Sequence, residues 1–311
     1  MQLNLLFYLA VFLFTGVVFS KLIRLIHLPD VTGYLIGGLI VGPAILGLVP
    51  GGVMDQLSLI SDVALGFIAF SIGGEFKLSY FKRVGIVPIV IAFFESITAV
   101  VFVVLGLLAI GQPLPFALVL GAIAAATAPA ATIMVIKQYK AKGPVTETLL
   151  SVVALDDAVA LIAVAKSLTS TEAVSMVSAI VEPVVEVLIS VGGGLLVGAA
   201  YTYLLRFFKT TANRLALTIG VVFITSSVAS ALNLSGLLTC MSVGAAFANF
   251  SKNSDDVFEL TERITPPIFM LFFVFSGADL DISILPSIGL IGVIYILLRP
   301  LGKFCGAWLG G

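Results

Sequence analysis

The chain has 311 residues, of which 60% are hydrophobic and only 11% are charged, and its mean hydropathy is +1.20. Soluble domains carry about 25% charged residues, so this composition excludes a water-soluble globular protein. The 16 basic and 17 acidic residues nearly cancel, so the charge balance gives no reason to expect a nucleic-acid partner.

Apolar runs long enough to cross ~30 Å of hydrocarbon recur along the whole chain. Short polar or Gly/Pro segments such as VPGGVMDQ, GQPLP and NLSG separate them. The pattern predicts an all-α polytopic membrane protein with about eleven spans, since an outer-membrane barrel would show ~10-residue segments of alternating polarity. The predicted spans are 4–26, 31–49, 57–76, 84–110, 115–137, 146–168, 175–205, 212–231, 234–250, 264–277 and 284–310.

The basic residues predict the orientation, because the cytoplasmic connections of membrane proteins are enriched in Lys and Arg. Thirteen of the 16 basic residues follow odd-numbered spans. These ends are therefore predicted to be cytoplasmic, with the N-terminus outside. The first run, 4–26, has no basic segment before it and is longer than a signal-peptide core, so we expect an uncleaved first span. The charged run 252–263, KNSDDVFELTER, is predicted to be a solvated loop.

Span 115–137 contains a proline in its middle, within the small-residue sequence TAPAAT. Pro129 removes a helical hydrogen bond and exposes backbone carbonyls, which membranes tolerate only where the backbone is buried or lines a cavity. The segment Thr127–Thr132, with Ala128 and Ala130 beside the proline, is therefore a candidate broken helix of the kind that meets ions in transporters. The alternative is an ordinary proline kink cushioned by the threonine hydroxyls.

Span 146–168 carries two adjacent aspartates, Asp156 and Asp157, in an otherwise apolar run. Each intramembrane carboxylate costs about 2.5–3.5 kcal/mol on insertion scales, so such residues usually face a partner or a water-filled cavity. Neighbouring helical residues point about 100° apart, so one structural partner can hardly satisfy both. A carboxylate pair in a wet cavity can bind a hard monovalent cation or a proton in competition, which is the chemistry of exchange. Structural pairing is the alternative.

Further ionisable residues deep inside predicted spans include Glu95, Arg299 and Lys303. Intramembrane charges of this kind are usually paired or functional. Glu95 lies on the span before the broken helix, so pairing with Arg299 or Lys303 is an open hypothesis. Lys166 lies near a span end and can extend to the interface. The two cysteines, Cys240 and Cys305, are predicted to be packing residues.

Several segments resemble a known group of proteins. They are GYLIGGLIVGPAILGLVP (33–50), TAPAAT, ALDDAVAL, GLLTCMSVGAAFANF, PPIFMLFFVFSGADLDI and RPLGKFCGAWLGG. The chain resembles bacterial cation:proton antiporters of the second cation:proton antiporter family, in its NapA and Kef-like branch. The resemblance implies an NhaA-like fold of two inverted repeats with a discontinuous core helix, a homodimer, and a place in the bacterial inner membrane.

The resemblance also implies a domain division. Residues 1–83 would belong mainly to a dimerisation domain, and 84–168 would form ion-translocating core helices, with the broken helix at 115–137 and the Asp pair at 146–168. Residues 175–250 would be second-half scaffold spans, and 264–311 would begin a second core repeat. The family has about thirteen spans, so we expect the chain to be a fragment that lacks the second discontinuous helix.

Roles for individual residues follow from the same resemblance. Asp157 would be the main carboxylate that binds the cation and the proton in alternation, assisted by Asp156, Thr127, Thr132 and the exposed carbonyls. Asp156 would pair with Lys303, as in electrogenic members.

We therefore expect a secondary transporter that exchanges a monovalent cation, most simply Na+, for protons by an electrogenic cycle. The alternatives are a K+/H+ exchanger of the Kef or germination type, a sodium-coupled organic-anion symporter on a similar fold, and a non-transporting scaffold. The sequence has one histidine, no G-x-S-x-G motif and no Walker-type loop, so it indicates neither an enzyme nor a primary pump. No cofactor is expected beyond the transported ions, Na+ (or K+ or Li+) and H+.

Overall fold

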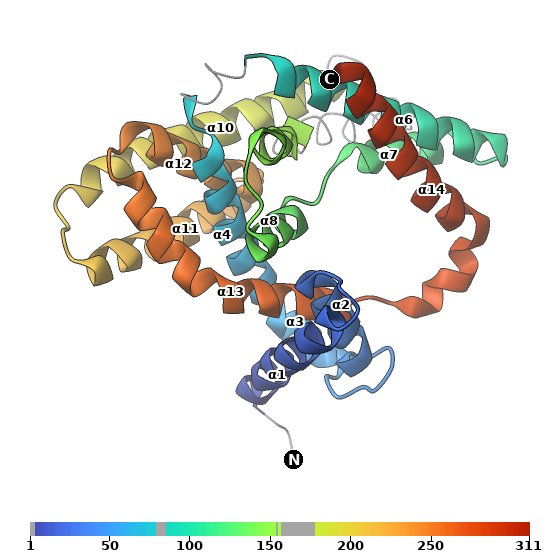
Figure 1. Ribbon diagram of the computed structural model, residues 1–311, viewed down its shortest axis with the longest axis horizontal. Helices are drawn as coiled ribbons and strands as arrows, with labels where there is room; N and C mark the ends of the chain where they lie inside the picture. The colour runs from blue at the N-terminus through green and yellow to red at the C-terminus, as the bar shows by residue number, and fades with distance from the viewer. Residues whose placement is uncertain (1–3, 79–84, 154, 157–177) are drawn as a thin grey trace.

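The computed structural model describes residues 4–78, 85–153, 155–156 and 178–311 (Figure 1). Every regular element in these ranges is helical, which confirms the predicted all-α class. In chain order the elements are α1 (Leu5–Arg24), α2 (Asp30–Val41), α3 (Gly51–Leu57), α4 (Leu59–Glu75), α6 (Val87–Ala109), α7 (Leu114–Ala125), α8 (Pro129–Tyr139), the helix Pro144–Val153, α10 (Ser178–Leu205), α11 (Thr211–Ala231), α12 (Gly236–Phe250), α13 (Ser254–Ala278), the short η1 (Ile282–Ile284) and α14 (Leu285–Gly310).

The hydropathy of the sequence correctly predicted the positions of most of these helices. Among the described residues, seven helices are long and apolar enough to cross a membrane. The predicted spans 4–26, 84–110 and 212–231 agree with α1, α6 and α11 to within three residues. The chain is thus a multi-pass membrane protein.

Predicted span 31–49 is too long, because α2 ends at Val41. Gly42 is extended, with ψ 178°, and Pro43 follows it. Proline lacks an N–H and disfavours the helical conformation in the residue before it, so the helix stops here although the apolar sequence continues.

The prediction of a solvated loop over 252–263 is wrong from Ser254 onward, where α13 begins. Asp255 and Asp256 lie in its first turn, where the helix dipole favours negative charge. Arg263 pairs with Glu259 one turn earlier at 2.7 Å. The charges therefore support a helical extension of the span at its polar end.

The helices form several groups (Figure 1). α14 packs along α6, and α7 packs on α6; α4, α10 and α12 pack together, while α13 lies against α2, α1 and α4. α8 lies between these groups and contacts α2 and α4. The break between α7 and α8 is therefore placed where the groups face one another.

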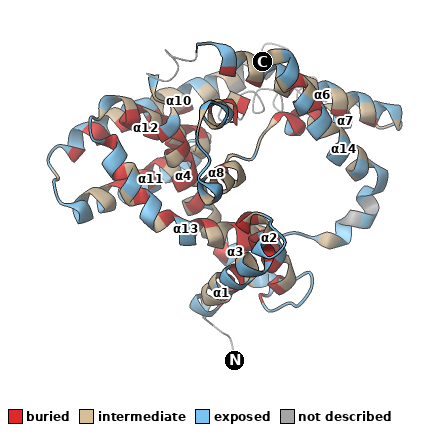
Figure 2. Cartoon of the chain, viewed as in Figure 1, coloured by how far each residue is buried: buried red, intermediate tan, exposed pale blue. Residues whose placement is uncertain are grey.

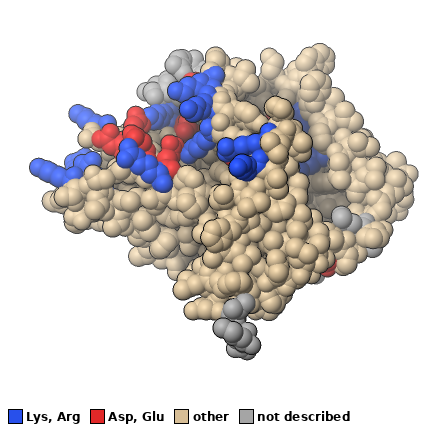
Figure 3. All heavy atoms as spheres, turned by 60° about the horizontal axis from the view of Figure 1, so that its bottom comes forward, with Lys and Arg blue, Asp and Glu red and all other residues tan. Residues whose placement is uncertain are grey.

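The surface has the polarity that a bilayer requires. Large apolar side chains such as Phe14, Leu196 and Trp308 are more than 70% exposed, and exposed residues lie along the outer faces of the helices (Figure 2). Figure 3 shows charged side chains gathered in one part of the surface, with uncharged residues covering most of the rest. Lipid can cover such an apolar surface, whereas water would not.

Close packing of α4 against α12 depends on two facing glycines, Gly73 and Gly244. A Cβ at Gly244 would overlap the carbonyl oxygen of Phe70, and one at Gly73 would overlap that of Met241. Small residues at such positions let membrane helices approach closely.

We expect Gly244→Ala to lower the free energy of unfolding by about 1–3 kcal/mol, because the overlapping atoms belong to the backbone and cannot rotate away. Thermal unfolding of the purified variant measures the loss. Gly193→Ala on α10 is the matched control, since a Cβ there meets no atom within 4 Å. Equal stability of the two variants would contradict the proposed contact.

Candidate functional site

The predicted broken helix is present. α7 ends at Ala125, Ala126 and Ala128 have extended backbones (ψ 145° and 99°), and α8 begins at Pro129. Proline suits the first position of a helix because its missing N–H has no helical partner there. The interruption thus separates two half-helices, and the alternative of a proline kink within one continuous helix is wrong.

The C-terminal end of α7 binds two cations of α14. Arg299 donates to the carbonyl oxygens of Ala126 (2.7 Å) and Ala124 (3.3 Å), and Lys303 Nζ donates to that of Ala125 (2.9 Å). The last carbonyls of a helix lack helical partners and carry its negative dipole end, so cations stabilise them. Arg299 therefore binds backbone carbonyls, and Lys303 is the residue that meets Glu95.

We expect Arg299→Met to lower the free energy of unfolding by about 1.5–3 kcal/mol, the range for hydrogen bonds to a charged group. Arg299→Lys should restore only part of the loss, because an ammonium cannot reproduce the guanidinium fork. Urea or thermal unfolding measures both variants. Arg263→Met removes an exposed pair on α13 and should cost less than about 1 kcal/mol; a loss as large as that of Arg299→Met would contradict the assignment.

Asp156 is the most deeply buried ionisable group of the site, with 0% exposure. One carboxylate oxygen accepts a hydrogen bond from Ser96 Oγ (3.0 Å). The other accepts from Thr127 Oγ1 (2.5 Å) and from Lys303 Nζ (3.1 Å). Three elements thus converge on this carboxylate: α6, the α7–α8 break, and α14.

Lys303 has more acceptors than it can use. Its Nζ lies 3.0 Å from Glu95 Oε1 and 2.7 Å from Thr127 Oγ1, besides the Ala125 carbonyl and Asp156. An ammonium group has three hydrogens. The three hydrogens of Lys303 are therefore shared among four acceptors.

The predicted site residues differ in how the structure places them. Glu95, Thr127, Asp156 and Lys303 meet in one hydrogen-bonded cluster, which we call the Asp156 cluster together with Ser96. Thr132 does not join it, because its hydroxyl donates to the carbonyl of Ala128 in its own half-helix (3.0 Å). Ala130 is buried in α8.

The proposed ion-binding residue Asp157 lies outside the described residues, as does Lys166.

Ser96 is a member that the sequence interpretation missed. It is fully buried and donates to Asp156. The only sequence signal was a hydroxyl directly after Glu95 in an apolar run, and serine is common in membrane helices for packing alone.

A cavity of about 940 Å³ lies on the α8 side of the break, between α8 and the helices α2, α4 and α13. Ion pairs and hydrogen bonds cross it: Lys137 of α8 lies 2.9 Å from Glu262 of α13, and Gln138 accepts from the backbone N–H of Asp30 (2.9 Å). Its lining includes Lys140 and Lys142, on the side predicted to be cytoplasmic.

A broken helix in a multi-pass membrane protein, with buried charges at the break, defines the class of ion-coupled secondary transporters. The comparison with known families makes the class specific. Residues 8–311 match the family described as "Sodium/hydrogen exchanger, transmembrane", so the chain belongs to this family.

Relatives and solved structures agree. The chain is 26% identical to the high-affinity Na+/H+ antiporter NhaS3 and 24% identical to the Na+/H+ antiporter NhaS4, both of Synechocystis sp.. These matches cover 89% and 90% of the chain and 70% and 75% of the relatives. The fold is similar to that of the sodium proton antiporter MjNhaP1 of Methanocaldococcus jannaschii at pH 8, with a TM-score of 0.74, 21% identity, and coverage of 97% of this chain and 78% of that one.

These findings confirm the resemblance to cation:proton antiporters at the level of the family. The assignment to the NapA and Kef-like branch stays a prediction. They confirm the antiporter fold and the assignment as a transporter rather than an enzyme, with transported ions in place of a cofactor. The K+/H+ and organic-anion alternatives gain no support from them.

Proposed function

We propose that this chain exchanges Na+ for H+ across the bacterial inner membrane by alternating access, with the Asp156 cluster and Asp157 as the site of competition. The observation that carries the proposal is the convergence of Asp156, Thr127 and Lys303 at the break between α7 and α8. Oxygen ligands from carboxylates, a hydroxyl and free carbonyls suit a hard monovalent ion. The relatives NhaS3 and NhaS4 are Na+/H+ antiporters, which favours sodium as that ion.

Charge balance gives the coupling. Glu95 and Asp156 carry two negative charges when ionised, and Lys303 and Arg299 carry two positive ones. The sequence adds Asp157, so the group sums to one negative charge. With Lys303 charged, a single bound proton neutralises the group, and a neutral site crosses a low-dielectric barrier at a much lower cost than a charged one.

Lys303 would act as the exchangeable partner. It holds Asp156 when no cation is bound, and a cation that takes the Thr127 and Asp156 oxygens displaces the ammonium. The displaced Lys303 then loses its proton, so the sodium-bound site carries one negative charge while the proton-loaded site is neutral. Each cycle exchanges two protons for one Na+ and moves one net charge, which the membrane potential drives at ~2.3 kcal/mol per charge per 100 mV.

The larger arrangement is proposed with the function. The helices of 84–168 and 264–311 would form the moving core, and those of 1–83 and 175–250 would form the scaffold of a homodimer. The basic residues at the ends of odd-numbered spans support a cytoplasmic position for those ends and an N-terminus on the outside.

Proton movement in proteoliposomes, followed with a pH-sensitive dye, tests the proposal. We expect added Na+ to move protons between pH 6.5 and 8.5, with Li+ next in effect and K+ without effect at equal concentration. A response to K+ that equals the response to Na+ would favour the Kef-type alternative. No response to any of the three ions would overturn the exchange function.

A further inference from the structure

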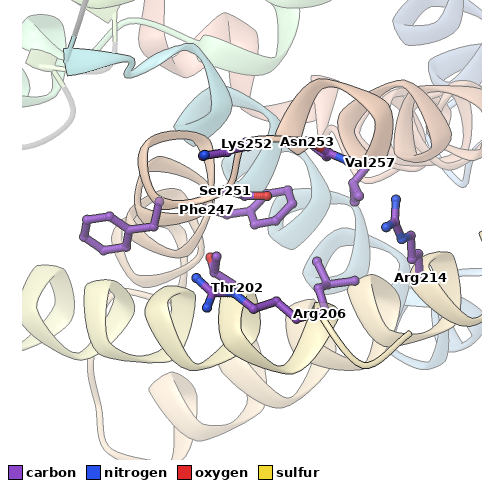
Figure 4. Close-up of a pocket in the computed structure, with 10 residues that line it drawn as sticks. Thr202, Arg206, Arg214, Phe247, Ser251, Lys252, Asn253 and Val257 are labelled. Atoms are coloured by element: carbon purple, nitrogen blue, oxygen red, sulfur yellow. The ribbon is translucent and has the colours of Figure 1, made fainter. Parts of the chain in front are cut away.

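A second cavity, of about 420 Å³, lies at the ends of α10, α11, α12 and α13, away from the Asp156 cluster (Figure 4). Its inner lining is apolar, with Leu205, Phe247 and Val257. Its outer lining contains three cationic side chains: Arg206, Arg214 and Lys252. Figure 4 shows Arg206 on the α10 side, Lys252 across from it near the α12–α13 connection, and Arg214 at one end.

Among the described residues, the cations around this cavity have no anionic partner. Within the ranges that the structure describes, no Asp or Glu lines the cavity and none of the three cations forms an ion pair. Arg214 uses its Nε on the carbonyl of Phe208 (3.1 Å), and the Arg206 guanidinium lies 5.9 Å from the Tyr203 ring. Three positive charges without compensation repel one another, and an anion at the centre would remove the repulsion.

The surroundings indicate a ligand that is part polar and part apolar. Beside the cavity, Tyr203, Phe207 and Phe250 are 57–66% exposed. These rings border the cations at helix ends, where the polar headgroups and the upper parts of the lipid chains meet a membrane protein. Basic pockets between membrane helices on the cytoplasmic side are a known type of site for anionic headgroups.

We propose that this cavity binds a phosphate-bearing anion, with the phosphate among Arg206, Arg214 and Lys252. The exposed aromatic border favours an anionic phospholipid as its source over a free phosphate compound. The site is separate from ion exchange, so its test does not depend on the transport function.

The experiment measures the unfolding temperature of the purified full chain in mild detergent as phosphatidylglycerol is added. The double variant Arg206→Gln/Lys252→Gln removes two exposed cations of the cavity. The matched control, Lys21→Gln/Lys209→Gln, removes two exposed lysines that lie outside its lining. Parallel titrations use phosphatidylcholine, which has no net charge, and glycerol 3-phosphate, which has no acyl chains.

We expect the wild type and the control to be stabilised at the same phosphatidylglycerol concentration. The cavity variant should need about 30-fold more, given the usual contribution of a basic residue near anionic lipid. Stabilisation by glycerol 3-phosphate that is lost in the cavity variant would support the anion site with a soluble source. The proposal would be overturned if the cavity variant and the control needed the same phosphatidylglycerol concentration. It would also be overturned if phosphatidylcholine and phosphatidylglycerol stabilised the protein equally. The cations would then interact only with the helix ends.

If the double variant is unstable without lipid, Lys252→Gln alone decides the matter, because that side chain has no hydrogen bond to any described residue. We expect it to need about fivefold more phosphatidylglycerol than Lys209→Gln. No difference between these two variants would again overturn the proposal.

Discussion

Replacing Lys303 by methionine is expected to lower the free energy of unfolding by about 3–5 kcal/mol, the usual effect of removing one partner from a buried ion pair. Methionine preserves most of the side-chain volume, so the loss reports the charge rather than a cavity. Asp156 has 0% exposure and cannot recover the lost hydrogen bond from water, and the Glu95 side chain is only 14% exposed. Thermal or denaturant unfolding of the purified protein measures the loss.

A compensating variant distinguishes the effect of the lost charge on stability from an effect of packing. The triple variant Glu95→Gln/Asp156→Asn/Lys303→Met removes both carboxylates together with the ammonium, and it should recover to within about 1–2 kcal/mol of the wild type. A single variant as stable as the wild type, or a triple variant no better than the single one, would contradict the central role of Lys303 in the cluster.

The second large effect is expected on sodium affinity. Asp156→Asn removes a charged oxygen from the proposed sodium site, and Thr127→Val removes a hydroxyl while keeping the shape of the side chain. Hydrogen bonds and contacts that involve a charged group contribute about 1.5–3 kcal/mol, which corresponds to roughly 10–100-fold in a binding constant. We therefore expect Asp156→Asn to raise the Na+ concentration for half-maximal proton movement at least about tenfold, and Thr127→Val to raise it by a smaller factor.

The measurement is the dye assay in proteoliposomes at fixed pH with a Na+ titration. Thr127→Ser keeps the hydroxyl and should stay within about threefold of the wild type. Asp55→Asn removes an exposed carboxylate of α3, outside the Asp156 cluster, and should change nothing. If Thr127→Val and Thr127→Ser behave alike, the hydroxyl is not a ligand.

Sequence patterns correctly predicted the helices that follow from hydropathy and the helix break that follows from proline. α1, α6 and α11 follow from long apolar runs, and the interruption before α8 follows from Pro129. The predicted end of α2 was wrong, because the apolar residues after Gly42 and Pro43 have the composition of a continuing span. The charged start of α13 was missed because a run of charged residues was interpreted as solvated, although the aspartates of its first turn and the Glu259–Arg263 pair support a helix.

The candidate site was predictable in its residue types but not in its partners. Intramembrane charge identified Glu95, Asp156, Arg299 and Lys303 one by one. The four acceptors around Lys303 come from three separate parts of the chain, and a backbone carbonyl such as that of Ala126 looks the same at every position in a sequence. Only the fold shows that Arg299 binds the end of α7.

The most direct test of the exchange mechanism is Na+-induced proton movement in proteoliposomes that contain the wild type, Asp157→Asn or Asp55→Asn at equal protein density. Our account predicts that the wild type and Asp55→Asn respond alike and that Asp157→Asn loses the response at every Na+ concentration, because an amide cannot carry a proton in exchange for the cation. A full response from Asp157→Asn would show that the Asp pair is structural and would contradict the account.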